Sequence, residues 1–158
     1  SNAAQIQPNK KRIPLQYTAK KDIVFDFGAM STNIDPKVAH GVKLSNAIVI
    51  PTLTDARSLQ GTIDTFNLVK EAGKPTIIVI NNFTNESKFN NAKNYLIETL
   101  GQLTILGIRT TTLFERVSKD VSEGFSNVHH NKVEYQLNKS RKNHEQVYDV
   151  IVALGSKQ

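Results

Sequence analysis

The sequence contains no cysteine and no long apolar run, and both absences exclude classes of protein. Without cysteine the chain cannot be a disulfide-stapled scaffold. No apolar stretch approaches the roughly 18 residues that a membrane span needs, which excludes an integral membrane protein. With 158 residues, 39% of them hydrophobic, the chain can form one domain that buries roughly 70% of the surface exposed by the unfolded chain. We expect a single cytoplasmic domain.

The net charge of +6 is concentrated near the beginning of the chain. Residues 1–21 hold five basic residues and no acidic one, whereas the remainder is nearly neutral. Ser1-Asn2-Ala3 resembles the remnant of an expression tag, so residues 1–20 are interpreted as a remnant and a basic arm, and residues 21–158 as the domain. Such an arm either contacts phosphates nonspecifically or is simply a solvated end.

Short apolar runs recur along the middle of the chain at the spacing of parallel strands. These runs are Asp22 to Phe27, Asn46 to Ile50, Thr76 to Ile80 and roughly Ile108 to Leu113. Helical patterns lie between the last three, which predicts an α/β fold with a mainly parallel sheet and helices on both faces.

The helices have recognisable ends in the sequence. The first runs from Asp55 to Ala72 and stops at Gly73 and Pro75. The second begins at Asn85 or Glu86 and ends at Gly101 or as late as Gly107. A terminal helix from about Arg141 to Leu154 carries Val147, Ile151 and Leu154 on one side.

The stretch "KDIVFDFGAMS" carries the first candidate site residues. An apolar strand that ends in Asp26 would place a carboxylate at the carboxyl edge of a parallel sheet, where open α/β proteins bind ligands. In phosphate-binding NTPases such an acid holds Mg²⁺, and a glycine in the position of Gly28 allows close approach to the phosphate. The alternative is an ordinary strand that happens to end in aspartate.

Several further segments, in the correct order, resemble the ParA/MinD/Soj family of partitioning ATPases. Asp22 to Asp26 is similar to the family's Walker B strand, and Pro51, Asp55 and Leu59-Gln60-Gly61 are similar to a later strand end and helix start. In "KPTIIVINN", Asn81 matches an asparagine that lies beside the adenine base. Ser122-Glu123-Gly124 falls in a segment that resembles the one after the family's last main strand. The resemblance covers about residues 21–125.

This resemblance implies a P-loop NTPase-like fold that acts in plasmid or chromosome partitioning. ATP and Mg²⁺ would promote formation of a homodimer, the dimer would hold DNA nonspecifically near the nucleoid, and hydrolysis stimulated by a partner such as a centromere-binding protein would release it. It also assigns residues by role: Asp26 to the metal; Asp26, Gly28, Pro51 and Asn81 to the cofactor; and the basic group Lys132, Lys139, Arg141 and Lys142 to nucleic acid. A solvated helical face is the alternative for that basic group, and no catalytic residue can be assigned.

The sequence departs from the family in lacking the Walker A loop, GxxxxGK[ST]. Without its amides and lysine nothing cradles the β- and γ-phosphates, so we expect this chain alone not to bind ATP tightly. Either the chain is the carboxyl-terminal portion of a longer ATPase, or it is a nucleotide-independent module that binds protein or DNA. The missing first strand would leave a sheet edge, which we expect "RIPLQYT", residues 12–18, or a second copy to cover. His129-His130 is interpreted as a loop pair rather than a metal site.

Overall fold

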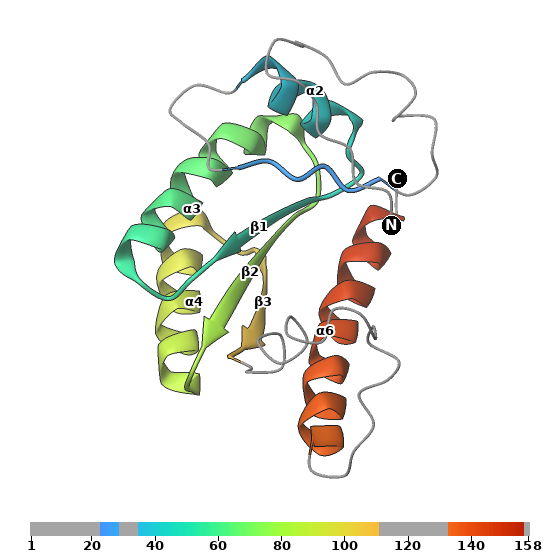
Figure 1. Cartoon of the computed structure of the whole chain (residues 1–158). Helices are drawn as coiled ribbons and strands as arrows, with labels where there is room; N and C mark the ends of the chain where they lie inside the picture. Colours follow the sequence, from blue (N-terminus) through green and yellow to red (C-terminus); the bar gives the residue numbers. More distant parts are fainter. Residues whose placement is uncertain (1–22, 29–34, 111–132, 157–158) are drawn as a thin grey trace.

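The computed structural model describes residues 23–28, 35–110 and 133–156, with the backbone alone for 133–140. Its centre is a three-stranded parallel sheet in the order β1-β2-β3 (Figure 1). The strands are β1 (Ile48–Thr52), β2 (Thr76–Phe83) and β3 (Thr104–Arg109). The predicted α/β fold with a parallel sheet is therefore confirmed.

Four α-helices accompany the sheet in the described part of the chain. They are α2 (Pro36–Leu44), α3 (Ala56–Val69), α4 (Glu86–Leu100) and α6 (Val133–Gly155), and the short 3-10 helix η1 (Lys70–Ala72) continues α3. None of the described helices is long and apolar enough to cross a membrane.

Side-chain caps explain where three of these helices begin. The Asp55 carboxylate accepts the Ser58 N–H at 3.0 Å, and the Asn85 side chain accepts the Lys88 N–H at 2.8 Å. Asp35 caps α2 in the same manner at 2.7 Å from the Lys37 nitrogen, and Pro36 occupies the first turn. The predicted beginnings of α3 and α4 are thus confirmed, whereas the sequence analysis did not assign α2.

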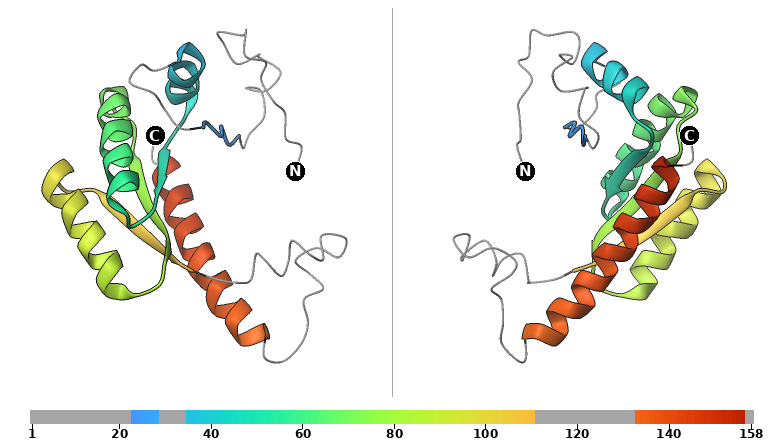
Figure 2. Two further views of the ribbon diagram at one scale, coloured as in Figure 1. Left: turned by 60° about the vertical axis from the view of Figure 1, so that its left-hand side comes forward. Right: turned by 90° about the vertical axis from the view of Figure 1, so that its right-hand side faces the viewer.

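Alternate residues of the strands supply two cores, one on each face of the sheet. On one face α2, α3 and α4 pack against Ile50, Ile78, Ile80 and Ile105. On the other face α6 covers Ile77 and Val79 with Val147, Ile151 and Leu154, which are the three residues predicted for its apolar side. The central strand β2 is buried on both faces, so its sequence is a continuous apolar run (Figure 2).

Two strands have boundaries that differ from the prediction. β1 continues through Pro51 to Thr52, and β3 begins at Thr104, four residues before the predicted Ile108. α4 ends at Gly101, the earlier of the two predicted stops, while Gly107 lies inside β3 against the rings of Phe83 and Phe89. α6 begins at Val133 rather than near Arg141. Helix and strand ends that depend on such packing carry no local signal.

The strand predicted over Asp22 to Phe27 is absent from the structure. Residues 23–28 have no regular secondary structure, and Val24 is 94% exposed. A strand requires a hydrogen-bonded neighbour, and no described residue supplies one for this segment. The predicted covering segment, residues 12–18, lies outside the described residues, as does the basic arm.

Candidate functional site

A pocket of about 350 Å³ opens at the carboxyl ends of β1 and β2, beside the first turns of α3. Ligands of α/β proteins commonly bind at this edge of a parallel sheet. The pocket is lined by Ile50, Pro51, Thr52, Leu53, Ser58, Gly61, Thr62, Thr65 and Asn81. Its lining includes Pro51 and Asn81, two of the residues that the sequence predicts to bind a cofactor.

Sheet register brings the two walls of the pocket together. Pro51 lies beside Val79 and Thr52 beside Ile80 in the parallel ladder, so Asn81 follows at the level where β1 ends. The chain then turns through Leu53 to Asp55 and enters α3, whose Ser58 and Thr62 face back toward the strand end. Neighbouring strand ends thus place Pro51 and Asn81 on one pocket.

The hydroxyl groups of the pocket direct their protons into the protein. Thr52 Oγ1 donates to the Leu53 carbonyl at 3.2 Å, and Thr62 Oγ1 donates to the Ser58 carbonyl at 2.9 Å. Ser58 Oγ donates to Asp55 Oδ2 at 2.7 Å. Each oxygen therefore keeps lone pairs that can accept a hydrogen bond from a ligand.

Asn81 supplies the complementary donor. Its Oδ1 accepts the N–H of Asn82 at 2.8 Å, and Asn82 adopts the left-handed backbone conformation with φ 56°. This short turn uses one lone pair of the amide oxygen, and the amide NH₂ can donate to a ligand. The pocket consequently offers one amide donor and several hydroxyl acceptors beside the apolar surface of Pro51 and Leu53.

None of the described residues that line the pocket has an ionisable side chain. The nearest charge in the hydrogen-bond network is the Asp55 carboxylate, whose pKa is lowered from its ordinary value mainly because the Ser58 hydroxyl donates to it, and further because the Ser58 N–H does. The described lining therefore offers a phosphate group no cation, and it offers no acid or base for proton transfer. The lining suits an uncharged group with an apolar face and a hydrogen-bonding edge.

The structure separates the other two predicted cofactor residues from this pocket. Asp26 and Gly28 do not line it, and the segment 23–28 lies on the side of α2, toward the end of the sheet where the strands begin (Figures 1 and 2). Among the described residues no group of three or more His, Asp or Glu side chains is arranged to hold a metal. The assignments of Asp26 to Mg²⁺ and of Gly28 to a phosphate remain predictions, and no step is derived from them.

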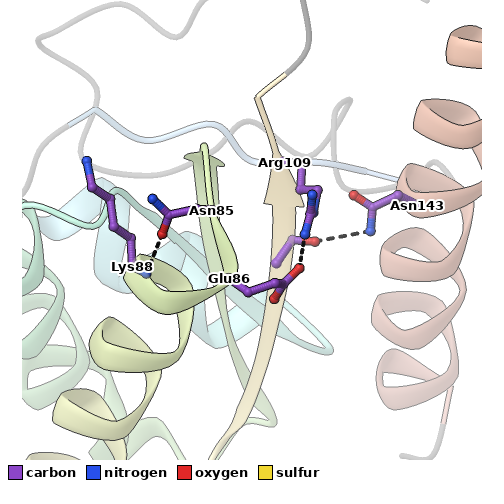
Figure 3. A network of polar contacts seen from close by, with 6 residues as sticks. Asn85, Glu86, Lys88, Arg109 and Asn143 are labelled. Carbon is purple, nitrogen blue, oxygen red and sulfur yellow. Dashed lines mark hydrogen bonds and ion pairs between the residues drawn. The ribbon is translucent and has the colours of Figure 1, made fainter.

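Polar contacts join both α6 and α4 to the carboxyl end of β3 (Figure 3). Asn143 Nδ2 donates to the Gly107 carbonyl at 3.1 Å. Two residues further along β3, Arg109 pairs with Glu86 in the first turn of α4 and stacks over the Phe83 ring at 5.6 Å. The sequence analysis singled out neither Arg109 nor Glu86, because nothing local indicates that these residues meet.

The predicted nucleic-acid residues are only partly described. Arg141 and Lys142 are exposed on α6, and Arg141 Nε lies 3.3 Å from Glu145 Oε1, one turn further along the helix. Nothing is described for the side chain of Lys139, and Lys132 lies outside the described residues, as do Ser122-Glu123-Gly124 and His129-His130. Half of the predicted basic group is thus seen on one exposed helical surface.

The chain was compared with protein-family models, with curated proteins and with solved structures, and none of the three comparisons found a match.

Proposed function

We propose that this chain is the carboxyl-terminal portion of a ParA-like ATPase that acts in plasmid or chromosome partitioning. In this proposal the pocket at the ends of β1 and β2 receives the base of ATP. The observation that carries the proposal is that Pro51 and Asn81, both assigned from the sequence, line one pocket although they come from different strands.

The chemistry of the pocket supports a base rather than a phosphate. Adenine is uncharged and planar, and its edge carries both hydrogen-bond donors and acceptors. The Asn81 amide can donate to a ring nitrogen, and hydroxyl oxygens such as that of Thr65 can accept from the exocyclic amine. The apolar surface of Pro51 and Leu53 suits the face of the ring.

The phosphates would require groups that this chain does not supply. The sequence has no Walker A loop, and the described residues that line the pocket include no basic one. When bound, Mg-ATP would supply the scissile phosphoanhydride bond, and the residues described here would orient only its base. We therefore propose that the isolated chain recognises the base weakly and does not hydrolyse ATP.

Titration of the isotope-labelled chain with adenosine and with Mg-ATP, followed by NMR, tests this proposal. We expect chemical-shift changes at Asn81, Ser58 and Thr65, with a Kd on the order of 1 mM for adenosine, since few ligand atoms are buried. Mg-ATP should bind within about threefold of adenosine, because no phosphate contact adds affinity. Submicromolar binding of Mg-ATP would contradict this proposal.

Asn81→Ala provides the site variant. It should weaken adenosine binding about fivefold or more, the loss expected for one buried hydrogen bond. Asn94→Ala, at an exposed position of α4 outside the pocket, is the matched control and should leave the affinity unchanged. Equal effects of both substitutions would show that the pocket is not where the base binds.

A nucleotide-independent module that binds DNA is the second candidate. The exposed pair Arg141 and Lys142 on α6 favours it. Binding of a short duplex should then fall steeply with salt, because each neutralised phosphate releases counterions. The double substitution Arg141→Ala and Lys142→Ala should reduce both the affinity and the salt slope, whereas the pair Lys70→Ala and Lys74→Ala after α3 should not.

A further inference from the structure

We propose that residues 23–27 dock as a fourth parallel strand on the outer edge of β1, with α2 as the crossover helix between the two strands. In the structure this segment has no regular secondary structure. The proposal concerns a second position of the segment and does not depend on nucleotide binding.

The described helices and strands follow a repeated plan along the chain. Each of the units α2–β1, α3/η1–β2 and α4–β3 joins a helix to the following parallel strand through a link of three residues. In the second and third units the helix is itself preceded by a strand of the same sheet, β1 and β2 respectively. The unit that contains α2 has no such strand, and the segment Ile23 to Phe27, which is apolar except at Asp26, lies eight residues upstream of α2.

The handedness of the connections selects the edge of the sheet on which the added strand lies. A strand–helix–strand connection between parallel strands is right-handed in about 98% of cases. α2 packs on the same face as α3 and α4, where Val42 joins the core formed with Leu59 and Ile63. With α2 on that face, the connection has the same hand as β1–α3–β2 only when the added strand lies beside β1, on the side away from β2.

The outer edge of β1 has the backbone groups that such a strand needs. The Ile48 N–H donates to the Pro75 carbonyl at 2.9 Å, so Ile48, Ile50 and Thr52 direct their backbone groups to β2. Val49 and Pro51 consequently direct theirs outward, and no described strand pairs with them. Pro51 has no N–H to leave unpaired on this side, while the carbonyls of both residues can accept.

The segment has the composition of a strand buried on both faces. Four of its five residues are apolar, as is usual for interior parallel strands: Ile23, Val24, Phe25 and Phe27. Val24 is nevertheless 94% exposed, the largest exposed fraction among the exposed large hydrophobic residues. Docking beside β1 would bury Val24 and bring Asp26 to the rim of the sheet where Asn81 lies.

The connecting chain is long enough for this rearrangement. Residues 28–35 separate the segment from α2, and eight residues can span up to about 26 Å. α2 can therefore keep its packing while the segment moves onto β1.

Hydrogen exchange of the full chain, read by mass spectrometry or NMR without added nucleotide, tests the docking without assuming a register. Because alternate amides of a strand face its neighbour, one of the two amides of Val24 and Phe25 should exchange at least about tenfold more slowly than in a free peptide of the same sequence. Val24→Asp should abolish this protection, whereas Val152→Asp, at an exposed valine of α6, should not. Exchange of both the Val24 and the Phe25 amide at the rate of the free peptide overturns the proposal.

Disulfide cross-linking identifies the edge. The chain has no cysteine, so pairs of introduced cysteines report without background. Neighbouring strands lie about 4.8 Å apart, within the Cα separation that a disulfide bridges. Val24→Cys should form an intrachain disulfide with Val49→Cys or with Pro51→Cys, and not with Thr104→Cys on β3, the opposite edge strand.

Equal cross-linking to Thr104→Cys, or cross-links only between two copies, would also overturn the proposal. Failure of adenosine binding would leave all of these results unchanged, so the two proposals fail separately.

Discussion

The ring of Phe89 lies directly against the backbone of Gly107. A β-carbon at position 107 would stand 2.6 Å from Phe89 Cε2 and 2.9 Å from Phe83 Cε1, closer than real β-carbon contacts occur. The two rings are themselves in contact, with centroids 4.8 Å apart. This packing holds α4 against β3 and requires a residue without a side chain in the middle of the strand.

Gly107→Ala should therefore destabilise the protein by about 1–3 kcal/mol, the usual cost of inserting a methyl group into a filled core. Gly61 provides the control because a β-carbon there meets no atom within 4 Å. Gly61→Ala lies inside α3 and should stabilise by about 0.5–1 kcal/mol. Urea unfolding of both variants measures the difference, and a neutral Gly107→Ala would show that the rings move aside freely.

The cap of α3 should make stability depend on pH in the acid range. The folded-state pKa of Asp55 lies below its ordinary value, chiefly because of the Ser58 hydroxyl. A carboxyl group with a lowered folded pKa stabilises the fold fully above its unfolded pKa, about 3.9, and loses this contribution as the pH falls through the folded pKa. Ser58→Ala raises the folded pKa toward the unfolded one and should flatten this dependence.

The measurement is the urea midpoint of the wild-type protein and of Ser58→Ala between about pH 2 and pH 5, the range in which such a carboxyl group titrates. Ser87→Ala, which removes an exposed serine hydroxyl from the first turn of α4, is the control and should follow the wild type. Parallel curves for the wild type and Ser58→Ala would mean that the hydroxyl has no influence on the carboxylate.

Exchange of proline and valine should change the free energy of unfolding little at Pro51 and strongly at its register partner Val79. Pro51 faces the outer edge of β1, so Pro51→Val should change the free energy of unfolding by less than about 1 kcal/mol. Val79→Pro removes a ladder hydrogen bond from the central strand and should cost about 3 kcal/mol or more. Thermal unfolding followed by circular dichroism compares them. A large loss from Pro51→Val would indicate that its ring, rather than its position, stabilises the strand.

The elements that the sequence predicts well are those with local signals at both ends. α3 has an aspartate cap at Asp55 and a glycine stop at Gly73, where φ is +65°, so its boundaries can be read directly. Asp35 and Pro36 mark the beginning of α2 equally well, but its short apolar pattern did not identify it. The sequence predicts the beginning of β3 too late, because Gly107 resembles a helix stop. The contact of Gly107 with the ring of Phe89 explains why a glycine lies inside this strand.

The candidate site also has features that the sequence predicts and features that depend on contacts between distant segments. Pro51 and Asn81 could be predicted to meet because consecutive parallel strands end at one rim of a sheet. The Arg109–Glu86 pair could not, since it depends on where α4 begins relative to β3. The strand predicted over Asp22 to Phe27 is absent from the structure, because an apolar run does not by itself place a segment beside a neighbouring strand.

α6 is longer than the strand β3 that it packs against. Its 23 residues span about 34 Å, whereas the six residues of β3 span about 20 Å. Asn143 fastens the helix near the end of β3, and the turns before it extend past the sheet (Figure 2). Helical segments of fewer than about 12 residues are marginal on their own in water. We therefore expect the turns before Asn143 to unwind before the part of α6 that packs on the sheet when the protein is warmed.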